Sequence, residues 1–267
     1  MEHRQIKSKS GTTHYWISKR ENSQCVVFTH GLTASHIMFE KQVEYFSKDY
    51  TVITWDVPMH GESRPYKNFS YENTAMELRE ILKTEQIEQV FLVGMSMGGY
   101  PSQEFALLYS EMVSGFVALD TTPYGLGYYS KFDKWCLKRV EPMAKCFPEK
   151  MLKKSMAKSV SKTEYSYATM VKMLEPLKKK EVCEQMGLAY AGFLKENRNA
   201  RFNFPVLILL GEYDATGKVK KYCEAWSKKE GYPLHIIKDA AHFSNGDNPD
   251  AVNKEISSFI EANTLKT

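Results

Sequence analysis

The sequence lacks any apolar run close to the roughly 20 residues that a membrane-spanning helix requires. Its opening, MEHRQIKSKSGTTHYW, carries charges with no apolar segment behind them, unlike a secretion signal. We therefore expect a soluble cytoplasmic protein that makes no stable insertion into membranes.

Cysteine is scarce and scattered. The five cysteines are Cys25, Cys136, Cys146, Cys183 and Cys223, and they form neither a CxxC pair nor a Cys/His spacing. Their number is odd and their positions are irregular, which argues against a disulfide framework and against a zinc site. We expect reduced thiols and no metal.

The chain as a whole also lacks a large excess of either positive or negative charge. Its 36 basic and 32 acidic residues leave a net charge of +4, which is too small to indicate a nucleic-acid partner. A hydrophobic content of 43% and a charged content of 25% are typical of a globular protein.

The positive charge is nevertheless concentrated in one segment. Residues 131–162 contain ten Lys or Arg against three acids, a net charge of +7, so the rest of the chain sums to −3. Lys153, Lys154 and Lys158 have helical spacing, which favours a solvated helix face. A field that steers acidic substrates and a surface for anionic lipid are the alternatives.

Short apolar runs recur along the chain with turn residues at their ends: CVVFTHG, YTVITWD, QVFLVGM, SGFVALD, PVLILLG and PLHIIKD. Such runs are typical of strands buried on both faces of a parallel sheet. Helical spacing lies between most of them, as in 73–83, where Met76, Leu78, Ile81 and Leu82 are expected to face inward, and in 99–109. This alternation predicts a doubly wound, mostly parallel α/β sheet.

The two ends of this pattern differ from its middle. The opening RQIKSKSGTTHYWISK reads as a hairpin with Ser10 and Gly11 in its turn, which adds antiparallel strands at one edge. Residues 124–200 contain helix-like stretches punctuated by proline and no strand-like run. We expect a core of residues 1–123 and 201–267 with 124–200 inserted as a helical cap, or lid.

The stretch VFLVGMSMGGY contains Gly94-Met95-Ser96-Met97-Gly98, a G-x-S-x-G pattern between a predicted strand and a predicted helix. In such a nucleophile elbow, a strained turn lifts the serine hydroxyl above the sheet, and the flanking glycines remove side chains that would collide. The helix that begins near Gly98 directs its N–H groups at the same place. Ser96 is therefore the candidate nucleophile.

A serine hydroxyl needs a base to take its proton and an acid to orient that base. LILLGEYDAT places Asp214 just after a strand, and IIKDAAHFS places His242 in the loop after the last strand. Their separation of 28 residues is about one βα unit, so both side chains are expected at the carboxyl edge of the sheet. The sequence thus predicts a Ser96, Asp214, His242 triad.

Other acids and the oxyanion donors leave alternatives open. Asp120 follows another strand, and Asp239 and Asp247 flank His242. Donors for the oxyanion hole are expected from the backbone N–H groups of Met97 and of Leu32 in the loop HGLTAS, with Thr33 as the alternative to Leu32. His30 in that loop is interpreted as a hydrogen-bonded residue that shapes the loop.

Together these residues resemble the α/β-hydrolase superfamily. The resemblance covers almost the whole chain: HGLTAS for the oxyanion loop, DVPMHGES for the next loop, GMSMGG for the elbow, GEYD for the acid and AAHF for the histidine. It implies a cofactor-free site under a helical cap. Met59 departs from the usual D-x-x-G-H-G-x-S, and the serine nucleophile disfavours a dehalogenase or an epoxide hydrolase.

The cap of this fold supplies much of the pocket wall. An apolar roof is expected from the cap residues Phe132, Trp135, Met143, Met151, Met156, Tyr167, Met170, Met173 and Met186. Flexible thioethers and aromatic rings would suit an acyl chain or an aromatic group.

The sequence therefore predicts a serine hydrolase that cleaves carboxylic esters of small to medium size through an acyl-enzyme, with a small-molecule ester as its substrate and no nucleic-acid partner. The same fold also resembles C–C hydrolases, enzymes that make peracids, and a lyase that eliminates pyruvate in menaquinone synthesis. A ligand sensor with little turnover is an alternative of another class.

Overall fold

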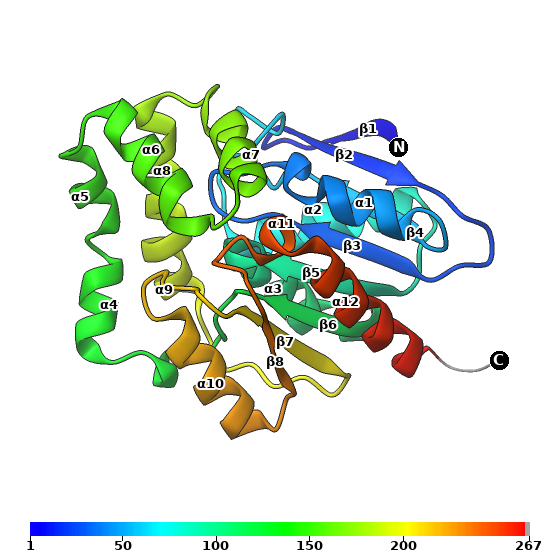
Figure 1. Cartoon of the computed structure of the whole chain (residues 1–267). Helices are drawn as coiled ribbons and strands as arrows, with labels where there is room; N and C mark the ends of the chain where they lie inside the picture. Colours follow the sequence, from blue (N-terminus) through cyan, green and yellow to red (C-terminus); the bar gives the residue numbers. More distant parts are fainter. Residues whose placement is uncertain (265–267) are drawn as a thin grey trace.

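Eight strands pair into one sheet in the computed structural model, which describes residues 1–264 (Figure 1). Their order across the sheet is β1-β2-β4-β3-β5-β6-β7-β8. β1 and β2 form the expected hairpin at one edge and pair antiparallel, whereas the pairs from β4 to β8 are parallel. The strands are β1 (Glu2–Lys7), β2 (Thr12–Ser18), β3 (Cys25–Thr29), β4 (Thr51–Trp55), β5 (Val90–Met95), β6 (Val113–Leu119), β7 (Val206–Gly211) and β8 (Leu234–Ile237).

The helices follow the strands in the alternation that the sequence predicts, and the doubly wound α/β fold is confirmed. They are α1 (Glu40–Phe46), α2 (Tyr71–Thr84), α3 (Gly99–Leu108), α4 (Lys131–Leu137), α5 (Val140–Lys145), α6 (Glu149–Val160), α7 (Glu164–Leu174), α8 (Lys179–Gly187), α9 (Phe193–Glu196), α10 (Val219–Glu230), α11 (Ser244–Asp247) and α12 (Pro249–Asn263). None of the helices within residues 1–264 is both long enough and apolar enough to cross a membrane.

The central strands are buried on both faces because helices cover both sides of the sheet. One apolar cluster packs α2, α3 and α10 against one face through Leu78, Phe105 and Trp226. The other cluster packs α1 and α12 against the opposite face through Phe46 and Ile256. All residues of β3, β4, β5 and β7 are buried in this arrangement.

Two details of the sequence prediction are wrong. β8 is only partly buried, with Ile236 48% exposed, because it is an edge strand with a neighbour on one side. Met76 was expected inside α2 but is 49% exposed. Leu78, Ile81 and Leu82 form the buried face of that helix, and Met76, two residues before Leu78, lies on the opposite side at about 100° per residue.

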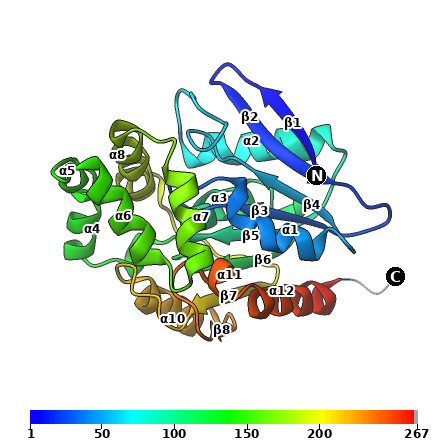
Figure 2. The same cartoon turned by 45° about the horizontal axis from the view of Figure 1, so that its top comes forward.

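Every regular element between β6 and β7 is helical, from α4 to α9, with a short π-helix at Leu188–Gly192. In Figures 1 and 2 the helices α4, α5, α6 and α8 gather beyond one end of the sheet. We call residues 124–200 the helical insertion. It brings side chains from distant parts of the sequence to the end of the sheet at which Ser96 lies.

Candidate active site

Ser96 lies in a sharp turn between β5 and α3. It begins a short 3₁₀ turn, Ser96–Gly98, and α3 follows from Gly99. Its φ of +50° is in the left-handed region, which is strained for a residue with a side chain. A Cβ at Gly98 would collide with the carbonyl oxygen of Thr29, and one at Gly94 would lie 2.7 Å from the carbonyl oxygen of Gly98. The turn therefore needs both glycines to bring Ser96 out of the sheet.

The structure brings together Ser96, His242 and Asp214. The Nε2 atom of His242 lies 2.8 Å from Ser96 Oγ, and its Nδ1 atom lies 2.8 Å from Asp214 Oδ2. A carboxylate only accepts hydrogen bonds, so Nδ1–H donates to Asp214 and Nε2 is left to accept from the Ser96 hydroxyl. This is the proton arrangement that a base beside a serine nucleophile requires.

The environment of His242 stabilises the protonated form of its imidazole ring. Burial of the imidazole opposes a positive charge, but the charge and hydrogen bond of Asp214, together with the charge of Asp120, outweigh it and raise the pKa of His242 above its usual value of 6.5. Asp214 is itself held by the backbone N–H of Thr216, which donates to Oδ1 at 2.8 Å. The imidazolium that forms when Ser96 loses its proton would therefore be stabilised.

The other acids near the histidine have different partners. Asp120 accepts from the N–H of Gly211 at 2.7 Å and from the hydroxyl of Ser244. Asp239 is exposed and pairs with Lys162. Asp247 accepts from the backbone N–H groups of Lys162 and Ala241, at 2.9 Å in each case. In the structure, Asp214 is the acid that binds the His242 ring.

The loop that follows β3 forms another wall of the site. Leu32 and Thr33 both line the cavity beside Ser96, and Thr33 has a φ of +57°. His30 is buried and bridges two segments: its Nδ1 donates to the carbonyl of Gly31 at 2.7 Å, and its Nε2 accepts from the N–H of Val57 at 3.0 Å. This bonding matches the loop-shaping role expected for His30.

The side chain of Met97 packs into the core instead of the cavity. The group that Met97 could contribute to the site is therefore its backbone N–H, which directly follows Ser96.

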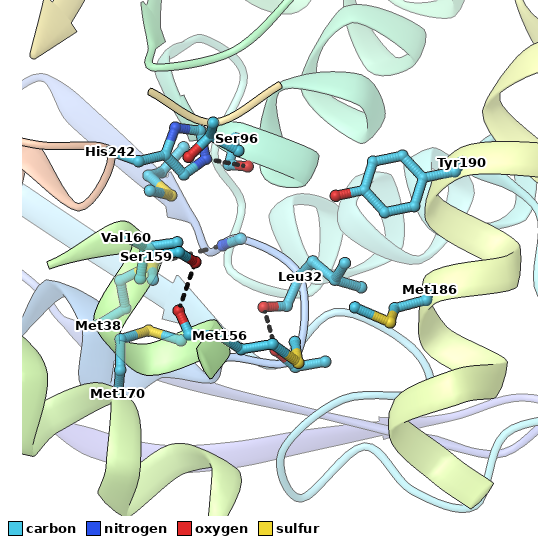
Figure 3. A pocket seen from close by; sticks show the side chains of 14 residues that line it. Leu32, Met38, Ser96, Met156, Ser159, Val160, Met170, Met186, Tyr190 and His242 are labelled. Carbon is cyan, nitrogen blue, oxygen red and sulfur yellow. Dashed lines mark hydrogen bonds between the residues drawn. The ribbon is translucent and has the colours of Figure 1, made fainter. Parts of the chain in front are cut away.

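A cavity of about 150 Å³ opens beside Ser96 and His242 (Figure 3). Its walls are mostly apolar, with Leu32 and Val160 among them, and the ring of Tyr190 projects into it from the π-helix. Five methionines contribute to the lining: Met38, Met95, Met156, Met170 and Met186. Their thioethers are flexible enough to adapt to different apolar groups.

The expected apolar roof is correct for only three of its residues. Met156, Met170 and Met186 line the cavity, and Met173 is buried in an apolar cluster. Phe132, Trp135, Met143 and Met151 are instead more than half exposed, and Tyr167 lines a separate surface hollow. Sequence reasoning missed Met38 and Met95 because Met38 lies in the short 3₁₀ helix His36–Phe39 and Met95 ends β5, both outside the helical insertion.

The departure at Met59 has a structural consequence. Met59 has a φ of +71°, a conformation that glycine adopts without strain. Its N–H donates to the carbonyl of Ser63 at 3.1 Å, and its carbonyl accepts from Nε2 of Gln185 in α8 at 2.6 Å. Residues 56–64, which we call the 56–64 loop, therefore keep their turn and connect the core to the helical insertion.

The cysteines and the basic segment behave as ordinary structural groups. All five cysteines are free thiols. Within the basic segment, Lys145 pairs with Glu141 and Lys153 with Glu149, each at 2.7 Å and one helical turn apart. These contacts are those of a solvated helix surface.

The chain matches the model of the alpha/beta hydrolase fold over residues 24–249, and it belongs to that family. Among curated proteins it is 34% identical over 83 residues to 3-oxoadipate enol-lactonase 1 from Acinetobacter baylyi, a match that spans 31% of either chain.

Solved structures with the same fold include a thermophilic esterase from Thermogutta terrifontis. It has a TM-score of 0.80 at 20% identity and covers 99% of this chain and 100% of its own. The enol-lactonase from Burkholderia xenovorans LB400 has a TM-score of 0.75 at 18% identity and covers 97% of this chain and 100% of its own. At these identities the likeness concerns the fold.

Proposed function

We propose that this protein hydrolyses carboxylic esters of small to medium size, with Ser96 as the nucleophile. The observation that carries the proposal is the chain of two 2.8 Å hydrogen bonds from Ser96 through His242 to Asp214, beside an apolar cavity. In this proposal residues 124–200 act as a cap over a core of residues 1–123 and 201–267.

The reaction would proceed in two halves. Ser96 Oγ attacks the ester carbonyl while His242 takes the hydroxyl proton, and the negative oxygen is held by the N–H groups of Leu32 and Met97. The imidazolium then returns the proton to the leaving alcohol. Water attacks the acyl-enzyme, with His242 again accepting a proton, which releases the acid and restores the serine. Asp214 orients the ring throughout.

The size of the cavity favours a substrate with a small acyl group. A volume of about 150 Å³ is similar to that of an engineered apolar cavity that holds benzene. The mostly apolar lining favours an aliphatic or aromatic acyl group, and the Tyr190 hydroxyl is one of the polar groups on the walls. A lactone is a cyclic ester, so the enol-lactonase names of two similar proteins are compatible with the same chemistry.

Labelling with a fluorescent fluorophosphonate tests the nucleophile. The wild type should be labelled and Ser96→Ala should not, whereas Ser159→Ala, which changes another cavity serine, should be labelled like the wild type. The wild type should also hydrolyse p-nitrophenyl esters with an optimum at short acyl chains. A folded wild type that neither labels nor turns over any ester would contradict the proposal.

The alternatives predict other results in the same assays. A C–C hydrolase, a perhydrolase or a menaquinone-pathway lyase would be labelled at Ser96 but would turn over its own substrate class in preference to the ester series. A ligand sensor would show ligand-dependent thermal stabilisation that survives Ser96→Ala, with no turnover by the wild type.

A further inference from the structure

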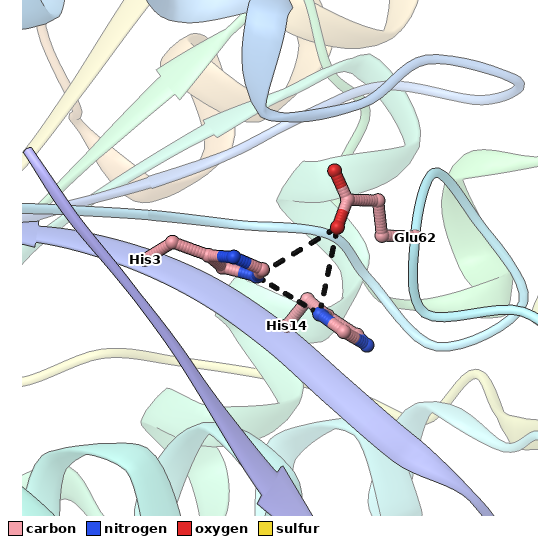
Figure 4. A group of neighbouring side chains, drawn as sticks. All are labelled: His3, His14 and Glu62. Atoms are coloured by element: carbon pink, nitrogen blue, oxygen red, sulfur yellow. Dashed lines mark hydrogen bonds and ion pairs between the residues drawn. The ribbon is translucent and has the colours of Figure 1, made fainter.

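His3, His14 and Glu62 come together from three separate elements (Figure 4). His3 belongs to β1, His14 to β2, and Glu62 to the 56–64 loop after β4. Within residues 1–264 this is the one group of three or more His, Cys, Asp or Glu side chains with the spacing of metal ligands, and it does not line the cavity beside Ser96. We propose that it is a binding site for Zn²⁺ or a similar divalent transition-metal ion.

The spacing of the three donor atoms fits a zinc ion. His3 Nε2 and His14 Nδ1 are 2.9 Å apart, and Glu62 Oε2 lies 3.7 and 3.6 Å from them. A circle through the corners of this triangle has a radius of about 2.0 Å, so one point lies at that distance from all three atoms. Zinc bonds to imidazole nitrogen and carboxylate oxygen are roughly 2.0–2.2 Å long.

The chemistry of the donors selects among cations. Two imidazoles and one carboxylate suit Zn²⁺ and its transition-metal neighbours, whereas Ca²⁺ and Mg²⁺ prefer sites built from oxygen alone. Three protein ligands leave a further position, which water fills in zinc sites of this kind. His3 and Glu62 are about half exposed, so solvent has access to that position.

The fold holds two of the donors near each other through the backbone. The N–H of His14 donates to Ser63 Oγ, and the carbonyl of His14 accepts from the N–H of Asp56, both at 2.9 Å. The N–H of Glu62 donates to Asp56 Oδ2 at 2.7 Å. The segments that carry His14 and Glu62 are therefore joined before any ion binds.

His3 is positioned by stacking. It lies opposite Trp16 in the register of β1 and β2, and the two rings are nearly parallel with their centroids 4.7 Å apart. His36 covers the other side of Trp16, with centroids 3.4 Å apart. This stack limits where the imidazole of His3 can go.

Without a cation, the two imidazoles share a hydrogen bond. The ring centroids of His3 and His14 are 5.2 Å apart and the facing nitrogens 2.9 Å, so the rings lie end to end and one donates its N–H to the other. When the ion binds, the donor ring carries its proton on its other nitrogen, so that both facing nitrogens offer lone pairs, and each ring turns by roughly 40° to aim its lone pair at the ion.

Zinc titration of the chelator-treated full-length protein tests the site. Calorimetry should show one ion bound per chain, and the melting temperature should rise by roughly 5–10 °C at a hundredfold excess of zinc over its dissociation constant. His14→Gln should weaken binding by at least about tenfold and, at the same zinc concentration, cut the rise in melting temperature to about half or less.

His235→Gln is the matched control, because His235 Nδ1 faces Glu255 Oε2 at 2.7 Å in a pair that has no third ligand among the described residues. This variant should bind zinc like the wild type. His3→Gln and Glu62→Gln alter more exposed side chains, so they keep the test decisive if His14→Gln does not fold. The proposal would be overturned if the wild type bound no zinc, or if all three ligand variants bound zinc as tightly as the wild type.

Discussion

Asp120 and Asp214 follow the neighbouring strands β6 and β7, and both influence the charge on His242. They differ in what their oxygens bind: Asp214 accepts from His242, whereas Asp120 accepts from Gly211 and Ser244. Burial, together with repulsion from Asp214, raises the pKa of Asp120 well above its usual value. Asp120 is therefore bound to groups of the core, while Asp214 is bound to the His242 ring.

Replacing each acid by its amide separates these roles. Asp214→Asn should lower kcat for a p-nitrophenyl ester by roughly ten-thousandfold, because the amide favours the wrong tautomer of His242. Asp120→Asn is the matched control and keeps an oxygen acceptor for Gly211, so its kcat should fall by less than about tenfold. Near-wild-type turnover by Asp214→Asn, with a large loss in Asp120→Asn, would move the role of the acid to Asp120.

At the level of elements, α6 has two different sides. Met156, Ser159 and Val160 line the cavity, whereas Lys150, Lys154 and Lys158 are exposed. The helix thus carries part of the basic segment on its outside and part of the pocket wall on its inside. The two sides can be changed independently.

Replacing Lys150, Lys154 and Lys158 together by glutamine should change kcat/KM for a neutral short ester by less than about twofold, because a solvated face contributes little to the pocket. The measurement should be repeated with an ester of a dicarboxylic acid at low ionic strength. A selective loss with the anionic ester would support the steering field instead. A large loss with the neutral ester would contradict both interpretations.

The positions of residues that depend on the local sequence could be predicted. The elbow around Ser96 and the strand ends that carry Asp214 and His242 each depend on a few neighbouring residues and on the order of the strands. The outer members of the expected roof were not predictable in this way. Met151 precedes Met156 by five residues, which is about 140° around α6, and nothing in the local sequence indicates which side the core will cover. The role of Met38 and Met95 depends on long-range packing.

On the scale of the whole molecule, core and insertion meet through several polar contacts. Arg64 pairs with Glu181 of α8 at 2.6 Å, and Gln185 of the same helix donates to the carbonyl of Met59. On another side, the N–H of Phe243, next to His242, donates to the carbonyl of Val160 at 2.7 Å. The pocket therefore forms only when the core and the helical insertion are packed against each other in this arrangement.

That shared pocket is lined by sulfur from both parts: Met38 and Met95 from the core, and Met156, Met170 and Met186 from the insertion. Oxidation would convert an apolar thioether into a polar sulfoxide. Hydrogen peroxide should therefore reduce esterase turnover several-fold, and methionine sulfoxide reductases should restore it where a thiol reductant alone does not.

Leucine variants can locate the sensitive residues. Met156→Leu with Met186→Leu should resist peroxide, whereas Met143→Leu with Met151→Leu, which alters exposed methionines away from the cavity, should be inactivated like the wild type. Equal resistance of the two double variants would contradict this role of the lining. If the prediction holds, oxidants lower the activity of this hydrolase by acting on the thioethers of its pocket, and its five thiols take no part in the response.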